Sequence, residues 1–273
     1  MVNIIAEIGI NHNGEIELCK KMMLLAKVAG ADYAKIQKRN PDVCVPEAQK
    51  MISKDTPWGK MNYIDYKHCI EFNEEQIKEL CDYAANIGIG FFASVWDLDS
   101  VKLMSKYTHI AKLGSAVIND LELCKAARES FDFLIISTGM STENEILQCI
   151  DVCDPDVVMH TNSTYPCPVE DLNLRYIEYL METHIKPEIG WSSHCFGLVP
   201  TYAAIGMGVT WIEHHVTLDR EMWGSDQKSS VEPDGLIKLV KGVRAIEKAM
   251  QYPPGPRKQF DKENEKRKAL RRF

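Results

Sequence analysis

Residues 187–217 read PEIGWSSHCFGLVPTYAAIGMGVTWIEHHVT, and this stretch contains two short strand-like runs joined by an apolar helical segment. The first run, GWSSHC, reaches His194, and the second, VTWIEHHVT, reaches His215. A strand–helix–strand order of this kind predicts two neighbouring parallel strands with a histidine at each strand end. In an α/β barrel the strand ends carry the chemistry, so the two imidazoles are candidate metal ligands.

The same alternation of strand and helix runs through the whole chain. Eight strand-like runs are followed by helical stretches, namely NIIAEIG, DYAKIQ, GIGFFAS, HIAKLGS, FDFLIIST, DVVMHTNS, PEIGWSS and VTWIEHHV. The runs are almost continuously apolar, as expected for strands buried on both faces. Eight such units in about 250 residues predict a (β/α)₈ TIM barrel. A doubly wound open sheet is the alternative, although it usually contains fewer strands.

Helix signals support this division of the chain. Asn73, with Gln76 three residues later, predicts a capping box, and Thr142 is a second expected N-cap. Further helices are expected at 15–29, 99–107, 120–129, within 169–184, at 196–207 and at 233–250. We therefore expect one barrel domain over 1–252, with an insertion at 38–72 after the second strand. Residues 253–273 are polar and strongly charged, and predict a solvated arm or a linker.

Composition excludes several classes of function. The chain has 273 residues, a formal net charge of -7 and 45% hydrophobic residues. The negative charge argues against nucleic acid as a partner, and the apolar runs are too short for a membrane span. The N-terminus lacks the features of a signal peptide, and the nine cysteines contain no CxxC pair. We therefore expect a cytoplasmic protein with reduced thiols, in which Cys149 and Cys153 pack in the core.

Two lysines lie inside otherwise apolar strands, Lys35 in AKIQ and Lys112 in AKLGS. A buried ammonium group needs an anionic partner, which is either a bound anion or a structural salt bridge. Hydroxyl groups at the strand ends favour a ring for a small dianion, made of Lys35, Lys112, Ser94, Ser115, Ser137, Ser163 and Ser192. Above such a ring, His194 and His215 with oxygen ligands suit Mn²⁺ or Mg²⁺ better than structural zinc. The alternative for each histidine is a hydrogen-bonded core residue.

Several segments together resemble the sialic acid synthase family. They are AEIGINHNG, AKIQ, KLGS, ISTGM, HTNSTYPCPVEDLNL, IGWSSH and IEHHVTLDR, and they extend in order over residues 3–250. The resemblance implies a TIM barrel that condenses phosphoenolpyruvate with an N-acyl mannosamine-type sugar, giving a nonulosonic acid and phosphate. It also implies Mn²⁺ or Mg²⁺ as cofactor, a homodimer, and no nucleic-acid or membrane partner.

The resemblance also assigns roles to residues. His194 and His215 match the metal ligands of the family. The positions that hold phosphoenolpyruvate match Lys35, Ser94, Lys112, Ser115, Ser137, Ser163 and Ser192. The positions that line the sugar and the reacting centre match Glu7, Gln37, Tyr165 and Asp226.

The chain departs from the family pattern in two places. Many members carry an acidic residue soon after the GS of the fourth strand, where this chain has Val117. Many also carry a C-terminal antifreeze-like domain, and we expect this chain to lack it, because the chain stops at KALRRF, about where that domain would begin. Two alternatives follow. One is the same chemistry on another acceptor, such as a legionaminate or pseudaminate precursor or mannosamine 6-phosphate. The other is a catalytically impaired barrel that only binds its ligands.

Overall fold

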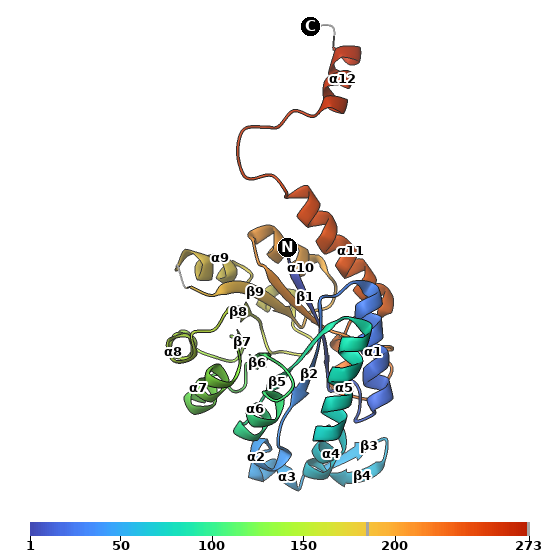
Figure 1. The fold of residues 1–273 in the computed structure, drawn as a ribbon, viewed down its shortest axis with the longest axis vertical. Helices are drawn as coiled ribbons and strands as arrows, with labels where there is room; N and C mark the ends of the chain where they lie inside the picture. Colours follow the sequence, from blue (N-terminus) through green and yellow to red (C-terminus); the bar gives the residue numbers. More distant parts are fainter. Residues whose placement is uncertain (184–185, 272–273) are drawn as a thin grey trace.

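The barrel strands form a closed parallel sheet. The structure is a computed structural model that describes residues 1–183 and 186–271. Within these residues, the strands close into a barrel in the order β1-β10-β9-β8-β7-β6-β5-β2 (Figure 1). Their bounds are β1 (Asn3–Gly9), β2 (Tyr33–Lys38), β5 (Gly90–Val95), β6 (Ile110–Leu113), β7 (Phe133–Ser137), β8 (Val157–His160), β9 (Glu188–Ser193) and β10 (Trp211–His215). The prediction of a TIM barrel is confirmed, and the open sheet is excluded.

The outer helices cover the barrel. They are α1 (Ile16–Ala29), α5 (Glu74–Ile87), α6 (Leu98–Met104), α7 (Leu121–Ser130), α8 (Glu143–Cys153), α9 (Arg175–Glu182), α10 (Val199–Met207) and α11 (Pro233–Ala249). The helix expected within 169–184 starts at Arg175, after a 3₁₀ turn at Val169–Asp171. Position 184 lies outside the described residues. Another expected helix, 196–207, starts only at Val199, because Gly197 turns the chain with φ of 85°.

Both predicted N-caps are present. The Asn73 side chain accepts from the Gln76 amide at 2.9 Å, and the Gln76 side chain accepts from the Asn73 amide at 3.0 Å. Thr142 and Glu145 form the second capping box. These reciprocal bonds satisfy amides that a helix start leaves unpaired, so they determine where α5 and α8 begin.

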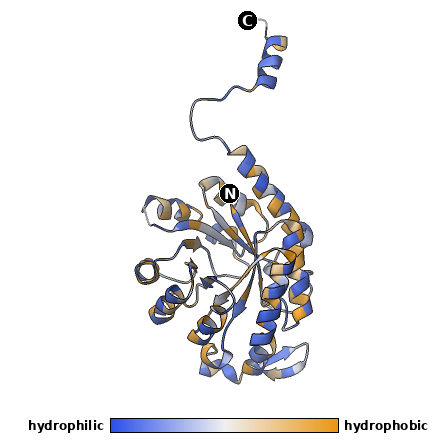
Figure 2. Ribbon diagram, viewed as in Figure 1, coloured by the Kyte–Doolittle hydropathy of each residue, from blue (hydrophilic) through white to orange (hydrophobic). Residues whose placement is uncertain are grey.

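The main hydrophobic core lies between the strands and the outer helices. Figure 2 shows helices with one apolar and one polar face, as this packing requires. Cys149 and Cys153 are buried, as expected; their sulfurs are 3.7 Å apart, and Cys149 lies 3.6 Å from Cys124. None of the helices in the described residues combines the length and apolar character needed to cross a bilayer.

The interior of the barrel has two layers of different chemistry. The apolar layer consists of Ile5, Phe92, Ile135, Val157, Met159 and Trp211. Toward the carboxyl ends of the strands lies the charged layer, consisting of Glu7, Lys35, Ser94, Lys112, Ser137, Ser192 and Glu213, all of them buried. Residues two apart on a strand face the same side, so β1, β5, β7 and β10 each pass from the apolar to the charged layer within one alternation.

The insertion at 38–72 is structured. It contains α2 (Pro41–Cys44), α3 (Glu47–Lys50), the hairpin β3 (Ser53–Thr56) and β4 (Gly59–Asn62), and α4 (Tyr63–Ile70). Tyr66 and Ile70 of α4 pack against Ile10, which follows β1, and Trp223, which follows β10. The insertion therefore lies at the carboxyl end of the barrel, beside the strand ends that carry the candidate site (Figure 1).

The charged segment after 252 differs from the expected arm in containing a helix. Helix α12 (Asp261–Leu270) has no buried residues and lies apart from the barrel in Figure 1. Its sequence explains the helix, because it is rich in Glu, Lys and Arg, with acidic residues in the first turn and basic ones in the last.

Candidate active site

One cavity at the carboxyl end of the barrel brings together twelve of the thirteen predicted site residues. Its volume is about 220 Å³. The predicted residues that line it are Glu7, Lys35, Gln37, Ser94, Lys112, Ser115, Ser137, Ser163, Tyr165, Ser192, His194 and His215. The thirteenth, Asp226, is not in its lining but lies next to His215. Because these residues come from all eight strand ends, only the closed barrel places them together.

The two buried lysines are already paired with carboxylates. Lys112 Nζ donates to Glu213 Oε1 at 2.7 Å. Lys35 Nζ lies 2.7 Å from Glu7 Oε2 and 3.6 Å from Glu213 Oε2. The structure therefore contains the salt bridges that were the alternative to an anion ring. It also aims the same ammonium groups into the cavity, so the two interpretations are compatible.

Glu213 is held ionised by its neighbours. Its burial opposes ionisation, but the charges of Lys112 and Lys35 outweigh that cost and hold the pKa of the Glu213 carboxyl below its usual range. Burial also lowers the pKa of Lys112, against the attraction of Glu213. Because the two groups are in direct contact, we take both as charged at neutral pH. The four charged side chains of the layer then sum to about zero.

The serine hydroxyls differ in how far they are already engaged. Ser94 accepts from Lys35 Nζ at 2.8 Å, and Ser192 donates to Glu213 Oε1 at 3.2 Å. Ser137 Oγ is buried and has no partner among the described residues. Such a hydroxyl is costly unless something binds to it, so Ser137 is the clearest vacant donor in the cavity.

A glycine lets two further hydroxyls approach the cavity. A side chain at Gly139 would collide with the hydroxyls of Ser163 and Ser115. Its absence allows the loop after β7 to pass close to both serines. The two hydroxyls come from loops after different strands, and they line the cavity together with Ser137.

His194 has a defined tautomer. Its Nδ1 lies 2.6 Å from the carbonyl oxygen of Asn162, which can only accept, so Nδ1 carries the proton. The lone pair of Nε2 then accepts from the Tyr165 hydroxyl at 2.9 Å. Burial, reinforced by the nearby His215, lowers the pKa of His194 to about 3. The ring is therefore neutral, as a metal ligand must be.

His215 offers an unsatisfied nitrogen beside a carboxylate. Its Nδ1 is buried, has no hydrogen-bond partner among the described residues, and lies 3.8 Å from Asp226 Oδ2. The rings of His194 and His215 are 5.4 Å apart. Gly9, with φ of 57°, leaves room here, because a Cβ at this position would lie 3.4 Å from the His215 ring. Imidazole nitrogens and carboxylate oxygens are ligand types that a divalent ion accepts.

The protein donors would fill only part of a metal coordination sphere. Within residues 1–183 and 186–271, no group of three or more His, Cys, Asp or Glu side chains is arranged to hold a metal ion. A closed structural zinc site is therefore not formed by these residues, and Cys195, which lies near Ser193 Oγ, is not in the cavity lining. The set suits an ion that takes its remaining ligands from water or substrate oxygens.

The candidate reacting-centre residues form a connected polar edge. Gln37 Nε2 donates to Glu7 Oε1 at 3.3 Å, and Arg39 donates to the other end of the Gln37 amide. Val117 is only partly buried and packs against the main hydrophobic core rather than lining the cavity. The carboxylates nearest the cavity are therefore Glu7, Glu213 and Asp226.

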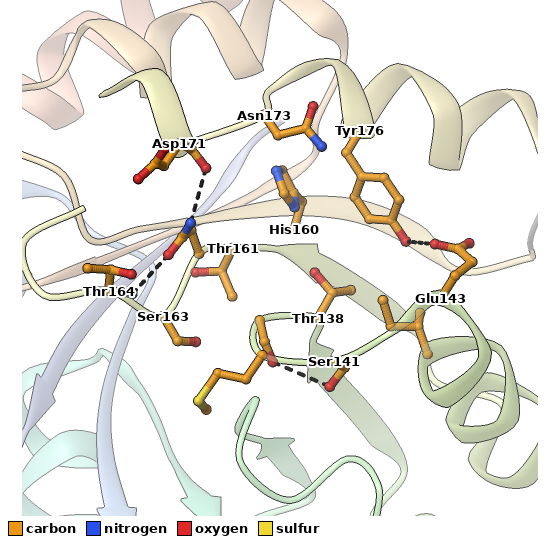
Figure 3. A pocket seen from close by; sticks show the side chains of 14 residues that line it. Thr138, Ser141, Glu143, His160, Thr161, Ser163, Thr164, Asp171, Asn173 and Tyr176 are labelled. Carbon is orange, nitrogen blue, oxygen red and sulfur yellow. Dashed lines mark hydrogen bonds between the residues drawn. The ribbon is translucent and has the colours of Figure 1, made fainter. Parts of the chain in front are cut away.

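A second, larger cavity of about 500 Å³ adjoins the first and shares Met140, Thr161 and Ser163 with it (Figure 3). His160 lies in this second cavity, where Nε2 donates to the Leu172 carbonyl at 2.8 Å. This bond and its burial make His160 a packed residue of the barrel, and it is not part of the lining of the anion cavity.

Glu213 is the residue that sequence reasoning overlooked. In VTWIEHHVT, Glu213 lies between Trp211 and His215 at spacings of two, so all three face the barrel interior. The signal was therefore available. An acidic residue two before a candidate metal ligand, in a barrel with two buried lysines, is their natural partner.

The sequence matches the NeuB family over residues 22–253. A curated relative, N-acetylneuraminate-9-phosphate synthase of Mus musculus, is 35% identical over 92% of this chain and 71% of its own length. N,N'-diacetyllegionaminic acid synthase of Campylobacter jejuni is 32% identical over 90% of this chain and 77% of its own. The crystal structure of N-acetylneuraminic acid synthetase from Leptospira borgpetersenii, in complex with citrate, superposes with a TM-score of 0.86. It is 29% identical and covers 100% of this chain and 93% of that one.

Proposed function

The chain belongs to the NeuB family, and from that premise we propose that it condenses phosphoenolpyruvate with an open-chain N-acyl mannosamine-type sugar. The products are a nonulosonic acid and inorganic phosphate. C3 of phosphoenolpyruvate forms a bond to the aldehyde carbon, water adds at C2, and the C2–O bond to phosphate breaks. The observation that carries the proposal is that two buried lysines, five serines and two imidazoles line one cavity.

In this proposal, the phosphoenolpyruvate anions contact Lys35, Lys112 and the vacant hydroxyl of Ser137. The remaining serines of the ring, Ser94, Ser115, Ser163 and Ser192, complete the donor set. Hydroxyl and ammonium donors held in a buried site bind phosphate and carboxylate oxygens without having to reorganise. The existing ion pairs keep the lysines oriented before the substrate arrives.

Glu7 is the proposed proton-handling group. Its carboxylate lies at the mouth of the barrel between Lys35 and Gln37, and Val117 leaves no acid at the end of β6 to share the task. A carboxylate in contact with a lysine can accept and return a proton during the addition of water. Gln37, Tyr165 and Asp226 orient the sugar around the same edge.

His194 and His215 are the proposed ligands of Mn²⁺ or Mg²⁺. When bound, the ion would act as a Lewis acid toward the sugar aldehyde. The charged layer sums to about zero without it, so the added positive charge also favours a doubly charged substrate. By the same family resemblance, we propose a cytoplasmic homodimer, to be checked by light scattering during gel filtration.

The experiment is turnover of phosphoenolpyruvate with N-acetylmannosamine and Mn²⁺, followed by phosphate release and by loss of phosphoenolpyruvate. We expect both to occur at equal rates. Failure with every N-acyl hexosamine, including legionaminate and pseudaminate precursors, would overturn the synthase proposal. Chelation should abolish turnover and added Mn²⁺ restore it, whereas a folded His194→Ala variant should stay inactive.

The position of Val117 favours one second candidate, a barrel that binds substrates without turning them over. Val117 is partly buried and packs against the core, so the family acid is not replaced at the same place. Calorimetry separates the candidates. Binding of phosphoenolpyruvate with no turnover on any acceptor supports the binding protein, and turnover on any acceptor excludes it.

A further inference from the structure

The second cavity, of about 500 Å³, has no role in the proposed function. Figure 3 shows its side chains converging from the loop after β7, the start of α8, the end of β8 and the start of α9. Most of them carry a hydroxyl, amide or carboxylate group, and Met140 and Ile146 carry the apolar side chains of the lining. A lining of this kind favours a ligand with hydrogen-bonding groups along its length over an apolar one.

The charges of the lining disfavour an anion. Glu143 and Asp171 contribute carboxylates, and the described residues that line this cavity include no lysine or arginine. The start of α8 does not compensate, because Thr142 and Glu145 already satisfy each other's backbone amides in the capping box. The two carboxylates belong to no group of three or more metal-ligating side chains in the described part of the chain. The second cavity therefore differs from the catalytic cavity, in which two buried lysines point at the ligand.

Two acceptor groups of the lining are held in place for a ligand. Glu143 Oε2 accepts from the Tyr176 hydroxyl at 2.7 Å, which fixes the carboxylate between α8 and α9 and leaves its second oxygen for a ligand. His160 donates from Nε2 to the Leu172 carbonyl, so its Nδ1 carries a lone pair. That nitrogen is buried and has no partner among the described residues. A ligand hydroxyl that reached it would satisfy an acceptor that is otherwise costly to bury.

The two cavities adjoin at the reacting centre. They share Met140, Thr161 and Ser163, and Thr161 Oγ1 lies 3.2 Å from His194 Nδ1. Gly139 keeps the boundary open, because a Cβ there would lie 2.2 Å from Ser163 Oγ. The catalytic cavity alone, at about 220 Å³, is smaller than the roughly 300–1,000 Å³ of most ligand pockets, although the proposed reaction joins two substrates.

We propose that the second cavity is a subsite for a neutral polyhydroxylated group, the chemistry of a sugar or of its open chain. Each hydroxyl of such a group both donates and accepts, which matches a lining of carboxylate and imidazole acceptors interleaved with serine and threonine hydroxyls. Glu143 and His160 are the proposed acceptors. The group belongs either to the acceptor sugar, in which case the inference rests on the proposed function, or to a separate free sugar.

The first test measures binding of mannitol, a neutral open-chain polyol, by saturation-transfer NMR in the presence of phosphoenolpyruvate. We expect saturable binding that Glu143→Gln weakens by about 10-fold, because a neutral acceptor replaces a charged one. The glutamine oxygen still accepts from Tyr176, and urea unfolding checks that the variant is folded. Asp151→Asn is the matched control, because Asp151 is an exposed acid of the same helix outside the lining, and it should bind mannitol like the native protein.

Three results of this test would overturn the inference. They are the lack of saturable mannitol binding, equal binding by Glu143→Gln and Asp151→Asn, and tighter binding of mannitol 1-phosphate than of mannitol. The phosphorylated polyol is the anionic counterpart, and the carboxylates of Glu143 and Asp171 should repel it.

The second test identifies the source of the group by steady-state kinetics. A higher KM for N-acetylmannosamine in Glu143→Gln, at unchanged kcat and unchanged KM for phosphoenolpyruvate, assigns the subsite to the acceptor sugar. An unchanged KM together with weakened mannitol binding assigns it to a separate sugar. If no acceptor is turned over but mannitol binding depends on Glu143, the subsite stands and only the proposed function fails. Turnover combined with any of the three contrary mannitol results leaves the proposed function standing and refutes the subsite.

Discussion

The apolar and charged layers of the barrel interior are built from the same strands, two residues apart. On β1, Ile5 belongs to the apolar layer and Glu7 to the charged layer; on β10, the corresponding residues are Trp211 and Glu213. Burying the apolar layer stabilises the fold by about 25 cal/mol for each Å² removed from water. Burying ion pairs costs desolvation that their attraction only partly returns. This cost agrees with our proposal that the charged layer binds the substrates, whereas the apolar layer adds to the stability of the barrel.

The largest expected effect is on the charged layer. Lys112→Met should lower turnover by at least about 100-fold, because a charge-stabilising donor is lost. It should also lower the free energy of unfolding by about 3–5 kcal/mol, since Glu213 keeps a buried charge without its nearest partner. Steady-state kinetics and urea unfolding measure the two effects. Lys102→Met, at an exposed position on α6, is the control and should change neither.

A double variant separates function from stability in the same layer. Lys112→Met combined with Glu213→Leu should regain most of the lost free energy of unfolding, because no unpaired charge remains from this contact. Its turnover should stay as low as that of the single variant. Recovery of activity in the double variant would contradict the assignment of Lys112 to substrate binding.

In the apolar layer we expect the opposite pattern. Phe92 is fully buried, and Phe92→Ala should lower the free energy of unfolding by about 3–5 kcal/mol. The folded fraction should keep kcat/KM within about threefold, because Phe92 does not line the cavity. Phe91→Ala, at a half-buried position on the outside of the same strand, should cost less stability. A large loss of activity in Phe92→Ala at unchanged stability would contradict the assignment of separate roles to the two layers.

Acid titration gives a third comparison. Burial lowers the pKa of His12 to about 3 in the folded protein, and its unfolded value is 6.5. Stability from the neutral ring is therefore complete above pH 6.5 and is lost as the pH falls, by about 1.4 kcal/mol per pH unit. Glu213 also loses stability in acid, but only below its unfolded pKa of 4.5.

The change in the free energy of unfolding between pH 6.5 and 4.5 is therefore due to buried histidines rather than to the charged layer. Urea unfolding across this window should show a shallower pH dependence for His12→Gln than for the native protein. An unchanged slope would mean that His12 does not titrate on unfolding, and a loss of slope in Lys112→Met would assign the effect to the charged layer instead.

The smallest effect is expected for the segment outside the barrel. We propose that 1–252 form the catalytic domain, because no residue of 253–271 lines the candidate cavity or contributes to the core. Removing 253–273 should change kcat/KM by less than about twofold and leave the unfolding midpoint unchanged. A marked fall in kcat/KM or in the unfolding midpoint would contradict this proposal. It would indicate that α12 contacts the barrel or a second copy of the chain.

Much of the architecture was predictable because local rules agree with the tertiary fold. The capping boxes at Asn73 and Thr142 determine helix starts through neighbouring backbone groups alone, so the sequence suffices for them. Helix starts without such a side-chain cap were less predictable. The helix expected from 196 starts only at Val199, because a glycine turn precedes it.

The residues of the candidate site could be predicted from the sequence, but the ion pairs between them could not. The lysines stand out in the sequence because a charge inside an apolar run is unusual. Which carboxylate meets which lysine does not follow from the sequence, because Lys112 and Glu213 are 101 residues apart and meet only across the barrel. The same limit applies to Glu143 and Tyr176 of the second cavity, which are 33 residues apart and belong to different helices.

The sequence by itself determined the eight strand–helix units, the strand ends that carry polar side chains, and the two histidines at 194 and 215, since these follow from patterns of period two and 3.6 within short segments. Which charges meet depends on the tertiary structure. It places the lysines beside Glu7 and Glu213, and it leaves the His215 nitrogen and the Ser137 hydroxyl without partners among the described residues. Electrostatic interactions act through space between segments far apart in the chain, so only closure of the barrel determines them.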